Sequence, residues 1–157
     1  MSVKTIYRQG RTEIDGRAFV DFAVRHSISY ADQDASHQVR LPLEAGRHVL
    51  GVRVRTLEAF TGGSPTVKIG DLQDDDGYIQ TTDVDVTALN SAGDSRQMGH
   101  DVTGTHTLNA YARGGRYYAA PNQIVVTMSA SLTAGRIALE VIFDGYEDGT
   151  RDMIANQ

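Results

Sequence analysis

Alternation of apolar and polar residues with a period of two constrains this chain more than any other feature. In "RAFVDFAVRHSIS", residues 17–29, Val20, Phe22 and Val24 fall on one face while Arg25 falls on the other. Successive side chains of a strand point to opposite sides of a sheet, so this segment is predicted to be a half-buried β-strand.

The same alternation returns in two later parts of the chain. "RHVLGVRVRTL", residues 47–57, is predicted to be a strand that pairs with residues 17–29. "NQIVVTMSASLTAGRIALEVIF", residues 122–143, is predicted to be a β-hairpin that turns at Thr-Ala-Gly. The inward positions expected to form the core are Val20, Phe22, Val24, Leu50, Val52, Val54, Ile124, Val126, Ile137, Leu139, Val141 and Phe143.

Turn signals are frequent and helix signals are few. Sixteen glycines separate short apolar pieces, and the best helical candidate, residues 81–93, supports only a short helix within a loop. We therefore predict an all-β antiparallel β-sandwich with long loops, a jelly roll being one form that it can take. The predicted division is an extended N-terminal arm at 1–16, the sandwich at 17–146 and a C-terminal tail at 147–157.

Composition excludes several classes of protein. The formal net charge of -5 argues against binding to nucleic acid, which usually requires a basic excess. The absence of cysteine excludes disulfides, thiolate metal sites and cysteine nucleophiles. No run of eighteen apolar residues and no signal peptide is present, so we expect no membrane partner and synthesis in the cytoplasm.

The segment "VKIGDLQDDDGYI", residues 67–79, concentrates four aspartates between two apolar stretches. Aligned on Gly77, a calcium loop would use Asp74, Asp76 and Asp83, but Leu72 occupies the position of the first ligand. Adjacent aspartates in a glycine-bounded loop also fit poorly to the paired carboxylates of a glycosidase. We predict a polar surface connection, residues 71–77, whose aspartates make local turn hydrogen bonds, and no metal site.

No catalytic or cofactor motif is present. The five histidines are dispersed, and "GHDVTGTH", with His100, Asp101 and His106, is as readily a polar loop as a ligand set. Nucleophile elbows, P-loops and dinucleotide fingerprints are missing. The expectation is a protein that is not an enzyme and that carries no cofactor.

Two segments have the composition of binding surfaces. "NAYARGGRYYAAP", residues 109–121, is rich in arginine and tyrosine, which anchor protein interfaces, although a turn whose tyrosines lie half in the core explains it equally well. The N-terminal arm is basic and either contacts a neighbour or is a solvated end. The candidate interface residues are Lys4, Arg8, Arg11, Tyr111, Arg113, Arg116, Tyr117 and Tyr118.

The order of several short motifs resembles that of a known family. A strand leads into "V-x-I-G-D", an Asp-rich connection ends in "G-Y", and a closing "T-A-G-x-I-x-L-x-V" follows downstream. Between Val49 and Phe143 this resembles the small structural proteins of tailed bacteriophages that decorate or cement capsids. Residues 1–29 are not part of the pattern.

The resemblance implies a function in binding. It implies a virion protein on the capsid surface that contacts the major capsid protein and stabilises the lattice, acting as a homo-oligomer, with a trimer favoured. The alternative is a receptor-binding or carbohydrate-binding β-sandwich of a tail or fibre, which an exposed aromatic platform would favour. A small hydrolase that uses the aspartate loop is the third class considered.

Overall fold

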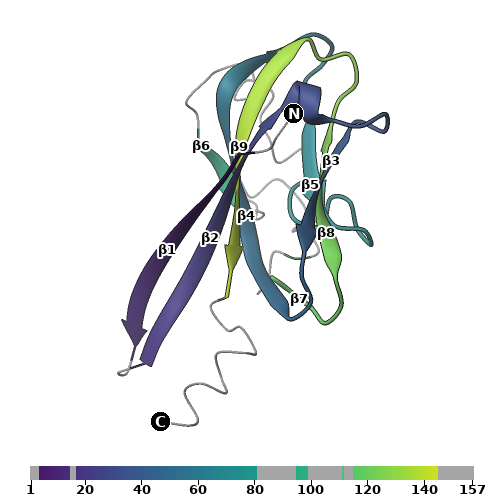
Figure 1. Cartoon of the computed structure of the whole chain (residues 1–157). Coiled ribbons are helices and arrows are strands. Elements are labelled where there is room, and N and C mark those ends of the chain that lie inside the picture. The colour runs from purple at the N-terminus through teal and green to yellow at the C-terminus, as the bar shows by residue number, and fades with distance from the viewer. Residues whose placement is uncertain (1–3, 15–16, 81–94, 99–110, 112–114, 145–157) are drawn as a thin grey trace.

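The strands of the chain form two antiparallel sheets that pack face to face (Figure 1). The computed structural model describes residues 4–14, 17–80, 95–98, 111 and 115–144, and the side chains of 23–80, 111 and 115–144 among them. Within these ranges, no helix is long and apolar enough to cross a membrane.

Among the described residues, the larger sheet has six strands and the smaller has three. The larger sheet follows the order β1 (Lys4–Ile14), β2 (Arg17–Ser29), β9 (Ala134–Phe143), β4 (Arg47–Thr61) and β6 (Ser95–Met98), and β7 (Arg116–Tyr118) also pairs with β4. The smaller sheet follows the order β3 (Gln38–Leu43), β8 (Asn122–Met128) and β5 (Val67–Gly70). A 3-10 turn, η1 (Tyr30–Asp32), connects β2 to β3 and begins in a capping box made by Ser29 and Asp32.

The architecture confirms the predicted all-β antiparallel sandwich, and the jelly-roll form stays a prediction. The segment expected as an extended N-terminal arm is the edge strand β1, which pairs with β2 from Lys4 to Ile14. From Phe22 to Ser29, β2 pairs with β9. Its first residues, 17–21, pair only with β1, and there the β1–β2 hairpin continues as a two-stranded ribbon past the rest of the sheet (Figure 1). The predicted boundary at residue 16 therefore falls in the sequence between the two paired strands β1 and β2. The C-terminal tail 147–157 and the helical candidate 81–93 lie outside the described residues.

Two predicted strand pairings are wrong. Strands β8 and β9 do not form a hairpin, because β8 is the central strand of the smaller sheet and β9 lies between β2 and β4 in the larger one. For the same reason β2 does not pair with β4. Period-two alternation shows which face of a strand is buried, but partners in one sheet and strands facing each other across a sandwich share that pattern.

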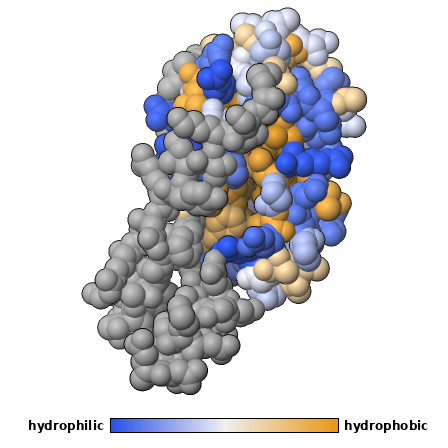
Figure 2. Space-filling view, viewed as in Figure 1, coloured by the Kyte–Doolittle hydropathy of each residue, from blue (hydrophilic) through white to orange (hydrophobic). Residues whose placement is uncertain are grey.

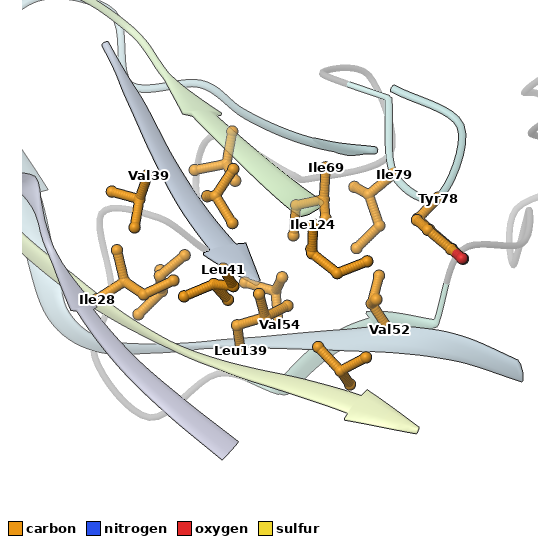
Figure 3. Packing of buried hydrophobic residues seen from close by; sticks show 14 of the residues in the cluster. Ile28, Val39, Leu41, Val52, Val54, Ile69, Tyr78, Ile79, Ile124 and Leu139 are labelled. Carbon is orange, nitrogen blue, oxygen red and sulfur yellow. The ribbon is translucent and has the colours of Figure 1, made fainter. Parts of the chain in front are cut away.

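The core lies between the inner faces of the two sheets. Figure 3 shows Val39 and Leu41 of β3 and Ile124 of β8 pointing towards Val54 of β4 and Leu139 of β9. Of the predicted core, Val52, Val54, Ile124, Val126, Ile137, Leu139 and Val141 are buried, Phe143 packs partly buried against the cluster and Val24 is half-buried. The side chains of Val20 and Phe22 lie outside the described residues.

Leu50 was predicted to be inward and is instead 38% exposed. Its neighbour Val49 pairs with Phe143, and the next partner pair is Gly51 with Ile142, so β4 has a bulge at Leu50. A bulge adds one residue to one strand and changes the face of the residues that follow. Val49 and Val52 are both fully buried as a result.

Truncating a leucine of the inner face should destabilise the protein much more than truncating a leucine of the outer face. Leu139→Ala is expected to lower the free energy of unfolding by about 2–5 kcal/mol, because it leaves a cavity in the packed core. Leu57→Ala, at a position of β4 that is 42% exposed, should change it by no more than about 0.5 kcal/mol. Urea unfolding followed by circular dichroism measures both, and similar losses would show that the inner face of β9 is wrongly assigned.

Candidate functional site

The Asp71 carboxylate is the most buried charged group that the structure describes. Asp71 directly follows β5 and is 1% exposed. Its Oδ1 accepts hydrogen bonds from the backbone N–H groups of Gln73 at 2.8 Å and Asp74 at 3.0 Å, which close the turn after the strand. The local turn bonds predicted for this loop are therefore present, but the prediction of a surface connection is wrong at Asp71 and at Gly77, which is also buried.

A chain of tyrosine hydroxyls ends on this carboxylate. The Tyr118 hydroxyl of β7 donates to Asp71 Oδ2 at 2.7 Å and lies 2.9 Å from the Tyr78 hydroxyl. Since Tyr118 has one proton to donate, Tyr78 must be the donor to Tyr118. Burial, followed by the hydrogen bonds to Tyr78 and Asp71, raises the pKa of Tyr118, and burial raises the pKa of Tyr78. Both phenols therefore remain protonated at neutral pH.

Arg116 supplies the positive charge opposite Asp71. Its Nη1 lies 3.1 Å from Asp71 Oδ2 and also donates to the Tyr111 hydroxyl, which in turn donates to Asp71 Oδ1 at 3.3 Å. The guanidinium lies 4.6 Å from the ring centroid of Tyr111 and 5.3 Å from that of Tyr118. These are cation–π distances, and the group remains partly exposed at 29%.

Two glycines allow the loop to fold onto this cluster. A Cβ at Gly70 would lie 1.9 Å from the Asp74 carbonyl oxygen, and a Cβ at Gly77 would lie 2.3 Å from the Tyr111 ring. Both approaches require a residue without a side chain. The "G-D" and "G-Y" steps of the sequence thus place the aspartate loop, β5 and Tyr111 in direct contact.

The cluster consolidates the fold and has no free reactive group. The carboxylate accepts four hydrogen bonds and forms an ion pair with Arg116, and the two buried phenols keep their protons, so none of the three is available as a base or nucleophile. Outside this cluster, His26 of β2 is half-buried opposite Leu139, and its burial lowers its pKa.

The three remaining aspartates of the loop lie together on its outer side. The carboxylates of Asp74, Asp75 and Asp76 lie within 4.8 Å of one another, and Asp75 pairs with Lys68. A hydrogen bond with Asp74, then burial, raises the pKa of Asp76. Asp74 and Asp76 were the candidate calcium ligands that the loop contributes, and the third, Asp83, lies outside the described residues, as do His100, Asp101 and His106. An acidic cluster of this kind is common on protein surfaces without an ion.

The predicted interface residues are placed differently from one another. Tyr118 is 4% exposed and belongs to the core, Tyr111 and Arg116 are half-buried in the cluster, and Tyr117 is 54% exposed. Arg113 and the side chains of Lys4, Arg8 and Arg11 lie outside the described residues. Within β1, Lys4 and Arg8 hold the register positions opposite Ser27 and Ala23.

A second group of charged residues, which no sequence motif marks, lies on the outer face of the larger sheet. Arg25 of β2 and Arg53 of β4 are the direct neighbours of Glu140 of β9 on either side. Arg25 Nη2 lies 2.6 Å from Glu140 Oε1, and Arg53 Nη1 lies 3.4 Å from Glu140 Oε2. These three residues come from three separate strands, so only the strand order brings Glu140 between the two arginines.

Large hydrophobic residues are also exposed. Figure 2 shows hydrophobic residues, in orange, beside strongly hydrophilic ones, in blue, on the described part of the visible face. Among the described residues, the exposed large hydrophobic ones are Leu50, Leu57, Leu72 and Tyr117. Three of these four lie on β4 and on β7, which pairs with it.

Comparison with known proteins identifies one fold of the same kind. No protein family matches the sequence, and no curated protein matches it either. A chain of the solved structure described as "Cyanophage Pam1 capsid asymmetric unit" is similar in fold, with a TM-score of 0.51 and 15% sequence identity. The similarity covers 86% of this chain and 93% of that chain, so it extends over nearly the whole of both.

Substitution of Asp71 should destabilise the protein far more than substitution of a surface aspartate. Asp71→Asn keeps the shape but removes the charge and points an N–H₂ group at buried donors, so we expect a loss of about 2–4 kcal/mol in the free energy of unfolding. The control, Asp75→Asn, breaks only the surface pair with Lys68 and should cost no more than about 1 kcal/mol. Urea titrations of both variants at pH 7 test this, and equal losses would contradict the role assigned to Asp71.

Asp76 should make stability depend on pH. Its pKa is higher in the folded protein than its ordinary value, so ionisation opposes folding: the penalty is absent below that ordinary value and appears as pH rises through the folded pKa. Asp76→Asn should therefore unfold at a higher temperature than the parent at pH 7 and at nearly the same temperature at about pH 3. If calcium raises the melting temperature of the parent at pH 7 and not that of the variant, the cluster is a metal site and this interpretation is wrong.

Proposed function

We propose that this chain is a non-enzymatic structural protein of a tailed bacteriophage, which binds the outside of the head and stabilises the capsid lattice. The observation that carries the proposal is the similarity in fold, over nearly the full length of both chains, to a chain of a cyanophage capsid structure. The sequence motifs that resemble phage decoration proteins support it, since they correspond to β5 with Asp71, the loop ending at Tyr78, and β9.

The chemistry of the described residues supports a binding role over a catalytic one. The buried carboxylate is joined to Tyr118, and through it to Tyr78, by hydrogen bonds, and with the ion pair to Arg116 these contacts connect the two sheets. Polar networks of this type fix one arrangement of a core. A protein that reinforces a shell needs such a rigid body.

The proposed assembly is a symmetric homo-oligomer, with a trimer favoured, in contact with the major capsid protein. A closed oligomer repeats the same contact at each symmetric site, so that weak individual contacts add to a stable attachment. For subunit and capsid contacts we retain Tyr117, which is exposed, together with Arg113 and the basic residues Lys4, Arg8 and Arg11 of the N-terminal segment. This surface would be held in place by three residues that pack in or against the core, Tyr111, Arg116 and Tyr118.

Deletion of the gene tests the proposal. Heads should assemble without the protein, but they should release their genome at a lower temperature than wild-type heads, because contacts that bridge capsid subunits are lost. A DNA-binding dye records the release during heating, and the protein supplied in trans should restore the wild-type temperature. Quantitative electrophoresis of purified heads should find the protein in copy numbers that match the capsid symmetry.

The tail or fibre alternative predicts a different result. If purified heads carry no copies and labelled antibodies find the protein at the tail tip, the decoration function is wrong. Binding of the purified protein to a host glycan would then establish the receptor-binding class.

A further inference from the structure

The outer face of the larger sheet carries a regular ladder of charged and small residues. Strand register places Arg25, Glu140 and Arg53 in one row across β2, β9 and β4. The next row holds Ser27, Ala138 and Arg55, and the row on the other side holds Ala23, Ile142 and Gly51. Large cationic side chains therefore stand beside small residues and Ile142, on a face opposite to the one that packs on the smaller sheet.

Arginine dominates the charge of this face. Arg25, Arg53, Arg55 and Arg136 are opposed by Glu140, which both Arg25 and Arg53 share, and by Glu58, which lies 3.9 Å from Arg136. Neither a hydrogen bond nor an ion pair joins Arg55 to any other described residue, and its side chain is exposed. The face is thus positive within a chain whose net charge is -5.

Exposed apolar residues accompany these arginines. Leu57 follows the row of Arg55 on β4, and Leu50 lies at the bulge beside Gly51. Arginines together with exposed leucines and few lysines are the composition of interface centres, where the guanidinium forms hydrogen bonds and the aliphatic groups exclude water. Lys4 and Arg8 hold register positions on β1 that continue the rows of Ser27 and Ala23 to the edge of the sheet.

We propose that this face, defined by Arg25, Arg53, Arg55, Arg136, Leu50 and Leu57, is the surface that docks on an acidic protein surface of the capsid. The inference rests on the proposed function and names the part of this chain that makes the contact. Charge complementarity selects the partner, because the arginines of this face exceed its carboxylates. A second copy docked face to face would place arginine against arginine, which disfavours this surface as its own partner.

Nucleic acid is a poorer partner than an acidic protein surface. A phosphate-binding domain uses many cations on a basic chain, whereas this chain is acidic overall and the face is mixed with leucines. Acidic surfaces of a protein supply both the carboxylates and the apolar area that the mixed face requires.

The test measures binding of purified protein to heads that were assembled without it. Arg55→Glu reverses a charge that has no intramolecular partner among the described residues, so the fold should be unaffected. It should weaken binding to heads at least tenfold at 50 mM NaCl, with a smaller loss at 300 mM because salt screens the charges. The control is Arg40→Glu, an exposed arginine on β3 of the other sheet that contacts Gln38 and Asp34 beside it, and it should bind like the parent.

A second pair of variants tests the apolar contribution. Leu57→Ser should weaken binding to heads, whereas Leu72→Ser, at an exposed leucine of the aspartate loop, should not. Melting curves of all four variants confirm that they fold, and sedimentation equilibrium gives their oligomeric state.

The outcomes distinguish this inference from the proposed function. If the parent protein binds heads and Arg55→Glu binds equally well, the docking face is wrong while the decoration function stands. If the parent does not bind heads, both are wrong. If Arg55→Glu changes the size of the oligomer and leaves the affinity of each subunit for heads unchanged, the face contacts a second copy, and the assignment to an acidic capsid surface is overturned.

Discussion

Burial of the Asp71 carboxylate is the constraint on which the arrangement of the two sheets depends. A buried charge is stable only when donors surround it, and the donors come from both sheets: the turn after β5 in the smaller sheet, and Tyr118 and Arg116 of β7 in the larger one. The bond between Asp71 and Tyr118 spans 47 positions of sequence. It fixes how β7, and through it the start of β4, lies against β5.

Apolar packing alone would leave this arrangement less defined. The core consists mostly of valine, isoleucine and leucine from alternating strands, and such side chains tolerate small shifts between two sheets. Hydrogen bonds to a buried charge are directional, so the cluster selects one position for the sheets. The outer face of the larger sheet, with Arg25, Arg53, Arg55 and Arg136, is then held in one orientation relative to the smaller sheet.

Sequence periodicity predicted β2, β4, β8 and β9 and the inward positions that these strands contribute to the core, but not which strands pair with which. The alternation of Val52, Arg53 and Val54 identified the inner face of β4 correctly. The predicted pairing of β8 with β9 is wrong because the two strands bury apolar faces in the same core from different sheets. The predicted inward position of Leu50 is wrong because a bulge arises only when two strands pair, and one strand alone does not show it. The cluster around Asp71 could not be predicted from the sequence for a related reason. An aspartate beside a glycine has the local pattern of a turn, and only the fold shows that tyrosines distant in sequence end on it.

Arg25 and Arg53 can pair with Glu140 in the free protein and still bind a carboxylate of a partner. Glu140 has two carboxylate oxygens, and each forms an ion pair with one arginine. These two ion pairs orient the side chains of Arg25 and Arg53 in the free protein. A guanidinium has five N–H donors, so each arginine keeps several that point away from Glu140. An incoming carboxylate can therefore bind without displacing Glu140, and the two ion pairs already restrict the side chains of Arg25 and Arg53 in the free protein. A pre-ordered basic surface of this kind favours specific, salt-sensitive attachment over loose association, which suits the attachment to a repeated capsid position that we propose.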